Sequence, residues 1–278
     1  MRSAQRVIKY FALALAAVLI FAIISGVFSV ISLAGFVTWG GDEPVGDTSV
    51  IWTGEDKENA LQQLEISAGA TNVRIVEVDK ADKPVRIESN SDYIESWQDG
   101  NTLKVIEKSH THWPWSDRAE VVVYIRAGVK FDKVDLIIKA GTLNIEKLTA
   151  EEVELELGAG KTYIGELRTT RRTRIDGGAG VVEVGGGELR NLDLELGAGR
   201  AEIRARILGD GRIDTGVGRL GLELLGEESD YKMTIDKGLG SVTLNGRKLE
   251  DGGIYGQGEN LLKIESGVGA VEIKTATN

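Results

Sequence analysis

The sequence predicts an all-β fold: a right-handed parallel β-solenoid with rungs of about 19–22 residues, preceded by one transmembrane helix. Three observations predict it. A glycine-centred segment recurs eight times, aliphatic residues alternate on both sides of that glycine, and a long stretch near the N-terminus carries no charge. We divide the chain into a cytoplasmic tail (1–9), a membrane anchor (10–40), a linker and N-terminal cap (41–62) and an extracytoplasmic solenoid (63–278).

The first 40 residues have the features of a single membrane-spanning anchor. No charged residue lies between Lys9 and Asp42, and a spanning helix needs about 20 apolar residues. Tyr10 and Trp39 would lie about 44 Å apart in a helix, close to the two interfaces that aromatic residues prefer. The basic residues before this stretch predict a cytoplasmic N-terminus. We therefore expect a single-pass protein of the cell membrane, with its C-terminal domain outside the cytoplasm.

A cleaved signal peptide is the alternative interpretation of this stretch. Small residues would permit cleavage after Ala34. However, the apolar core of a signal peptide has about 7–15 residues, and this stretch is far longer. We favour the retained anchor.

The repeats each combine a glycine corner with two short alternating strands. Every repeat has Leu or Ile five residues before the anchoring glycine and Val, Leu or Ile four residues after it. Such alternation lines one buried face of a strand, and glycine tolerates the backbone of a tight corner. From the second repeat to the seventh the glycines are 19, 20, 19, 19 and 22 residues apart, and the eighth follows after 29. The anchoring glycines are Gly69, Gly141, Gly160, Gly180, Gly199, Gly218, Gly240 and Gly269.

A unit of about 20 residues cannot bury its apolar face alone, but stacked copies share one continuous core. Each strand would pair in parallel with its copy in the next rung, and such crossovers are almost always right-handed. An antiparallel sandwich is the alternative, but it would not require aliphatic residues and glycine at the same aligned positions in every repeat. Residues 73–135 alternate without the glycine corner, so we expect broader first rungs there. Their strands are expected at 73–78, 85–89, 102–107 and 119–125.

Composition excludes several classes of function. The formal net charge is −10, and residues 1–9 contribute three positive charges, so the remainder carries −13. This balance argues against nucleic acid as a partner. The chain has no Cys, which excludes disulfides and thiolate chemistry. Both His residues share one loop, and the short rungs between Gly141 and Gly218 leave no room for loops that wall a cleft. We predict no enzymatic activity, no catalytic residue, no metal and no cofactor.

An acidic column precedes the glycine corners. Like charges on adjacent parallel strands repel, so the column requires compensation. We expect the carboxylates to accept hydrogen bonds from backbone amides of their own corners, with Arg174, Arg212 and Lys263 adding positive charge nearby. A ladder of oxygen ligands for divalent cations is the alternative. The column comprises Glu65, Glu156, Asp176, Glu195, Asp214, Asp236 and Glu265, with Ile137 in the second repeat.

A cluster of arginines is the first candidate binding site. Arg168, Arg171, Arg172 and Arg174 lie close together in the sequence and could bind an anionic wall polymer or an acidic patch on a partner. Charge pairing with the acidic residues of neighbouring rungs is the alternative, which we favour.

The insertion at 109–117 is the second candidate binding site. It contains His110, His112, Trp113 and Trp115. The tryptophans could stack on sugars or on a partner surface, since loops on a rigid scaffold often bind ligands. They could equally cover the side of the solenoid. The two histidines lack a recognisable third metal ligand.

The chain resembles the bacterial DUF4097 family over roughly residues 60–276. The resemblance rests on DGNTLKV (99–105), on VVVYIRAGVKFDKVDL (121–136) and on the repeated Leu/Ile-x-x-Gly-x-Gly corners. It implies a fold of β-strand repeats, often behind one N-terminal membrane helix, an adhesin-like role and no catalytic residues. The family commonly has Pro where Arg126 stands. Relatives of the family appear near envelope-stress and membrane-associated regulatory systems. The resemblance therefore also implies an alternative role, as an accessory or sensory component of such a system.

We therefore predict a non-enzymatic interaction module of the cell surface or envelope. Its partner would be an envelope protein or a surface polymer. The last repeat ends at Ile273 with little chain after it, so we expect an open sheet edge there and weak homo-association through the C-terminal rung. Residues 247–261 are the segment that could instead fold across this end.

Overall fold

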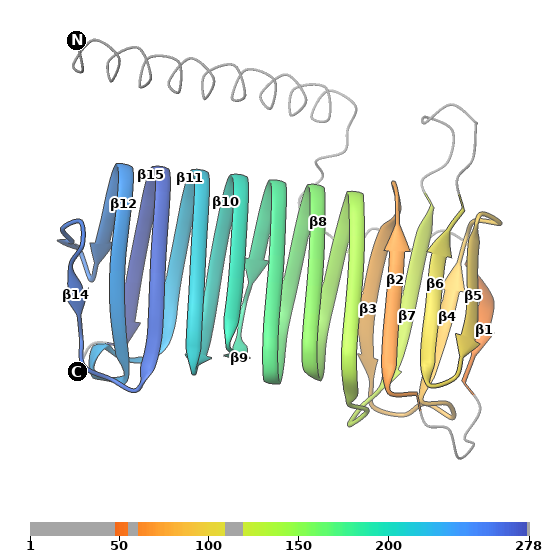
Figure 1. Ribbon diagram of the computed structural model, residues 1–278. Coiled ribbons are helices and arrows are strands. Elements are labelled where there is room, and N and C mark those ends of the chain that lie inside the picture. Colours follow the sequence, from red (N-terminus) through yellow and green to blue (C-terminus); the bar gives the residue numbers. More distant parts are fainter. Residues whose placement is uncertain (1–47, 55–60, 109–118, 277–278) are drawn as a thin grey trace, which may run out of the picture. The chain divides into compact units, whose positions relative to one another are not determined.

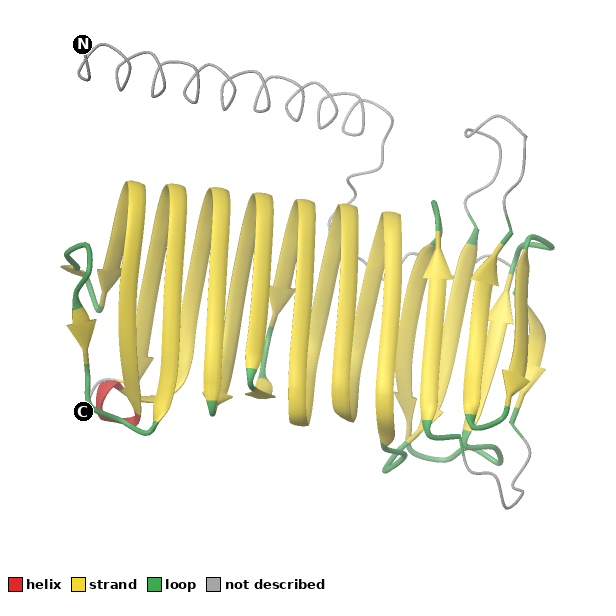
Figure 2. Ribbon diagram, viewed as in Figure 1, coloured by secondary structure: helices red, strands yellow, loops and turns green. Residues whose placement is uncertain are grey.

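The computed structural model describes residues 48–54, 61–108 and 119–276. The chain divides into two units, Met1–Pro44 and Val45–Asn278, and all described residues lie in the second. The all-β prediction is confirmed, because the only helical element in this described part is the short 3₁₀ turn η1 (Glu228–Asp230) (Figure 2). No helix among the described residues has the length and apolar character needed to cross a bilayer. The predicted anchor at 10–40 lies outside these residues.

The strands follow one another with few interruptions. The strand β8 runs through several corners, because the corners remain hydrogen-bonded to neighbouring coils. The strands are β1 (Ser49–Thr53), β2 (Gln63–Ala68), β3 (Asn72–Val78), β4 (Val85–Ser89), β5 (Ile94–Asp99), β6 (Thr102–Glu107), β7 (Glu120–Arg126), β8 (Phe131–Val184), β9 (Gly187–Arg190), β10 (Leu192–Leu208), β11 (Asp210–Glu227), β12 (Tyr231–Leu244), β13 (Arg247–Lys248), β14 (Ile254–Tyr255) and β15 (Asn260–Ala276).

The central repeats stack in parallel, corner upon corner. β10 pairs with β8 so that Gly199 lies opposite Gly180, and it pairs with β11 so that Gly199 lies opposite Gly218. Figure 1 shows the resulting coils side by side. Parallel pairing between consecutive repeats, as predicted from the glycine columns, is confirmed for these rungs. The right-handed sense of the coil stays a prediction.

The glycine corners are required by close approach between stacked backbones. Gly218 has φ +151°, and a Cβ added there would lie 1.9 Å from the carbonyl oxygen of Gly199. The earlier glycine of the corner is equally constrained: a Cβ on Gly158 would lie 2.2 Å from the carbonyl oxygen of Lys139. A side chain at either position would therefore push two rungs apart.

One continuous hydrophobic core runs through the stacked rungs. The aliphatic column five residues before each corner is almost fully buried, as Leu155, Leu194 and Ile264 illustrate with 0% exposure. A fully buried Leu or Ile side chain contributes about 1.5–3 kcal/mol relative to an exposed one. This core fixes the outward columns in register and thereby positions the charged side chains described below.

The order of rungs at the C-terminal end differs from their order in the sequence. β15 pairs in parallel with β11 on one side, where Gly269 lies opposite Gly218, and with β12 on the other, where Gly269 lies opposite Gly240. The last repeat is therefore an interior rung, and the expectation that it forms the free edge is wrong. The outer strand is β12, and part of the 247–261 segment covers it, since β13 and β14 both pair with β12 antiparallel.

The first repeat is also an interior rung. β2 lies between β6 and β8, and β3 lies between β7 and β8, all in parallel. The antiparallel strands β1, β4 and β5 complete this end of the sheet. The four strands expected within 73–135 are confirmed within a residue or two, whereas β5 was not expected and β1 lies in the segment assigned to the linker and cap.

The alignment of the first repeat by Gly69 is wrong by two residues. Ile66 rather than Leu64 lies opposite Leu136, and Val73 lies opposite Leu143. Thr71 therefore takes the corner position, and its carbonyl oxygen lies 2.4 Å from a Cβ added to Gly141. Glu65 lies opposite Asp135 and so does not belong to the acidic column.

Candidate functional site

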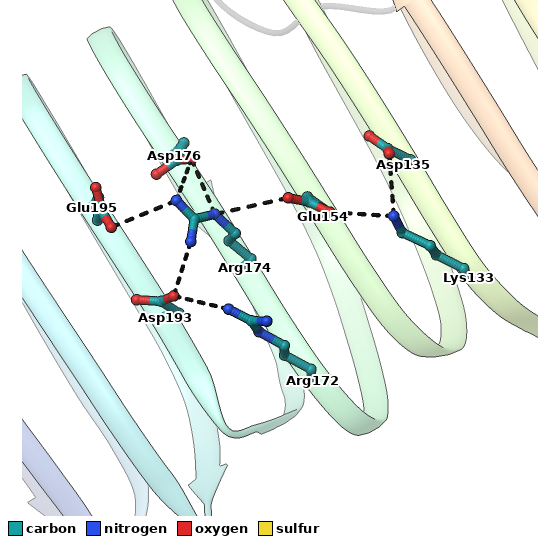
Figure 3. Close-up of polar contacts among 8 residues, drawn as sticks. All are labelled: Lys133, Asp135, Glu154, Arg172, Arg174, Asp176, Asp193 and Glu195. Atoms are coloured by element: carbon teal, nitrogen blue, oxygen red, sulfur yellow. Dashed lines mark hydrogen bonds and ion pairs between the residues drawn. The ribbon is translucent and has the colours of Figure 1, made fainter.

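Arg174 is the centre of a network of charges on the outward face of the rungs (Figure 3). Its guanidinium donates to Asp176 at 2.9 Å and to Asp193 at 3.2 Å. It also lies 3.6 Å from the carboxylate of Glu195 and 3.8 Å from that of Glu154. These carboxylates come from three adjacent rungs, so one cation compensates four acids.

The other three arginines of the predicted cluster are paired as well. Arg172 contacts Asp193 at 3.2 Å. Arg171 contacts Glu152 at 2.8 Å, and Arg168 pairs with its neighbour Glu166. The structure thus favours the charge-pairing interpretation of this cluster, and its role in binding stays a prediction.

Replacement of Arg174 by Gln is expected to destabilise the domain by about 1–2 kcal/mol. The side chain is only 29% exposed, and its loss would leave four neighbouring carboxylates without their shared cation. Arg171→Gln is the matched control: this arginine is 59% exposed, and we expect a loss below about 0.5 kcal/mol. Urea denaturation at low and high salt measures both. Equal losses for the two variants would contradict a special role for Arg174.

Basic side chains rather than corner amides compensate four carboxylates of the acidic column, namely Asp176, Glu195, Asp214 and Glu265. Arg212 donates to Asp214 at 2.8 Å, and Lys263 lies 2.5 Å from Glu265. The hydrogen bond from Lys263 is the main cause that lowers the pKa of Glu265 below its usual value. The expected compensation by Arg174, Arg212 and Lys263 is therefore confirmed. The expected hydrogen bonds from the corner amides to these carboxylates do not form in the described part of the chain.

The first corner shows amide capping by a distant carboxylate. One oxygen of Glu107 accepts hydrogen bonds from the backbone N–H of Gly69 at 2.6 Å and of Ala70 at 3.0 Å. It also accepts from the hydroxyl of Thr71 at 2.7 Å. Glu107 ends β6, directly before the segment that contains the 109–117 insertion. The sequence carried no signal for this contact, because 36–38 residues separate its partners.

A groove of about 910 Å³ runs across the rungs beside the acidic column. Six carboxylates of the sequence-predicted column line it, and glycines such as Gly178 and Gly197 form its floor. From the corner of Gly160 onward, the residue two positions before the corner glycine is also a glycine and adds no side chain to this floor. The Leu/Ile-x-x-Gly-x-Gly pattern in the sequence identifies these glycines as part of the corner, but it does not predict a groove. The carboxylates lining it are Glu156, Asp176, Glu195, Asp214, Asp236 and Glu265.

The divalent-cation alternative finds no support in the geometry of the groove. Within the described ranges, no three His, Asp or Glu side chains lie close enough together to hold a metal ion. The second candidate site, His110, His112, Trp113 and Trp115, lies outside the described residues.

Comparisons with known proteins identify a family and several distantly similar solved structures. The family model of Toastrack DUF4097 matches residues 61–252. A "putative cell adhesion protein" of Clostridium sporogenes ATCC 15579 is 18% identical, with 83% of this chain and 99% of that chain covered and a TM-score of 0.37. A "putative adhesin" of Bacteroides fragilis NCTC 9343 is 14% identical, with 85% and 100% covered and a TM-score of 0.31. No curated protein matches the sequence. Because its model matches more than half of the residues, the chain belongs to the Toastrack DUF4097 family.

Proposed function

We propose that the chain is a non-enzymatic interaction module of the cell envelope, adhesin-like in character. A single N-terminal helix would hold it in the cell membrane, with a right-handed stack of rungs outside the cytoplasm. One observation carries this proposal: the outward charges are paired from rung to rung into an extended, ordered surface. Stacked repeats typically use such surfaces to bind macromolecules.

The contact with an envelope protein or surface polymer is proposed to use the 109–117 insertion. Its two tryptophans are the bulky apolar side chains that commonly dominate binding energy at interfaces. The arginine cluster is a weaker candidate, because Arg168 and Arg171 already have acidic partners in the domain. Substitution of the tryptophans and of the arginines in separate variants can therefore show which of the two groups binds the partner.

Membrane topology and binding can be tested on the full-length chain. Protease added to intact protoplasts is expected to remove the C-terminal domain and spare the N-terminal tail. Complete protection of the domain, or a mature N-terminus at Gly35, would refute the anchored topology.

The binding test uses wall fragments and solubilised membranes with two double variants. Trp113→Ala/Trp115→Ala is expected to abolish capture by the full-length chain, and Arg168→Gln/Arg171→Gln is expected to preserve it. Capture unaffected by either variant would contradict the proposed contact. Specific capture of a membrane sensor protein would favour the accessory role instead.

A further inference from the structure

β11 and β12 are consecutive in the chain but are not neighbours in the sheet. Only the 3₁₀ turn η1 connects them, and β15 lies between them. One continuous segment, residues 210–244, therefore forms both walls of a slot. A segment that comes later in the sequence fills it (Figure 1).

The apolar side chains of β15 are buried in the slot. Leu262, Ile264, Val271 and Ile273 are at most 2% exposed within it. Leu262 depends on a glycine in the wall, since its Cδ2 lies 2.5 Å from the position that a Cβ on Gly211 would take. The backbone of β15 pairs with both walls over most of its length.

Both ends of the inserted strand are held by asparagine side chains. Asn260 accepts a hydrogen bond from the N–H of Gly209 at 3.0 Å and donates to the carbonyl of Asp230 at 3.0 Å. Asn245 accepts from the N–H of Thr275 and donates to its hydroxyl, both at 3.0 Å. These contacts recognise the segment 260–276 itself and do not involve the chain that delivers it.

We propose that the slot between β11 and β12 is a strand-acceptor site, which takes β15 from a second copy of this chain as well as from its own. The exchanged arrangement preserves every contact of the strand with the slot. Only the path of the short connection 256–259 differs between the two arrangements. Exchange of an identical element in this way is a low-cost route to a dimer. The inference does not depend on the proposed function.

The absence of Cys permits a direct test in the full-length chain, purified in detergent. Thr215 lies opposite Ser266 in the β11–β15 pair. Neighbouring strands are about 4.7–4.9 Å apart, within the Cα separation of about 4.4–6.8 Å that a disulfide requires. Thr215→Cys and Ser266→Cys chains with tags of different mass are unfolded together, refolded together and oxidised. We expect a mixed covalent dimer whose yield rises at least tenfold with protein concentration.

Three controls decide the outcome. Thr215→Cys mixed with Ser49→Cys measures random collision, because Ser49 lies on β1 and is exposed. Two double variants of a single chain test the register of β15 on each wall. Thr215→Cys/Ser266→Cys tests the β11 wall, and Lys237→Cys/Ser266→Cys tests the β12 wall. Each is expected to form an internal disulfide. A mixed dimer no more abundant than the Ser49 control, beside efficient internal disulfides, would overturn the proposal. Failure of both internal disulfides would overturn it as well, since the slot would then lack this register.

Discussion

Truncation after Gly258 is expected to lower the melting temperature by more than about 10 °C. In an ordinary repeat array, loss of the last repeat removes one interface and leaves the others intact. Here the truncation removes β15 from between β11 and β12, so two interfaces are lost. The four buried aliphatic side chains of β15 contribute about 1.5–3 kcal/mol each, against a typical domain stability of about 5–15 kcal/mol. One kcal/mol corresponds to about 2–4 °C for a domain of this size.

Thermal unfolding followed by circular dichroism measures the effect of this truncation. The control is truncation after Ala276, the last residue of β15, which should leave the melting temperature unchanged. β12 could partly compensate by pairing directly with β11, because Gly240 and Gly218 occupy equivalent corner positions. A loss below about 3 °C would show that this replacement is complete and that β15 contributes little.

Substitution of Gly218 by Ala is expected to cost about 3 kcal/mol or more. The added methyl group would lie 1.9 Å from the carbonyl oxygen of Gly199, and φ at this position is +151°. The backbone has no room to shift, because Gly218 is held between Gly199 and Gly269 by parallel pairing on both sides. Overpacking and backbone strain each cost about 1–3 kcal/mol.

Gly252→Ala separates the two contributions to this cost. Gly252 has φ +69°, but a Cβ there would meet nothing within 4 Å. This control should therefore show only the backbone strain, about 1–2 kcal/mol. Denaturant midpoints of the two variants measure the difference. Equal destabilisation would mean that the contact with the neighbouring rung is unimportant.

The repeats could be predicted from sequence because each carries its constraint locally. The aliphatic columns and the glycine corner recur at fixed distances, and the structure places them in the predicted register from Gly141 onward. The misalignment at Gly69 has a local cause too: Gly-Ala-Thr at 69–71 offers only one glycine, and it occupies the earlier of the two constrained positions.

The order of the outer rungs could not be predicted in the same way. β12 and β15 have the same column pattern, so either could pair with β11 on side-chain grounds. The segments that connect the strands determine which of the two lies beside β11. Their contacts, such as the hydrogen bonds of Asn260 with Gly209 and Asp230, join residues 30 or more positions apart in the sequence. The arginine cluster was predictable as a set of charges, but the role of Arg174 as its centre depends on Glu154 and Asp193, which lie about one repeat away on either side.

The glycine corners restrict how the length of this domain can change. A central rung adds one strand spacing, about 4.8 Å, and both ends of the sheet are completed by strands outside the central repeats. Insertion of a whole repeat of 19 or 20 residues would keep all glycine positions in register. Insertion of part of a repeat would place side chains against the carbonyl oxygens of the next rung. The distance between the two ends can therefore increase or decrease only in whole steps of one rung.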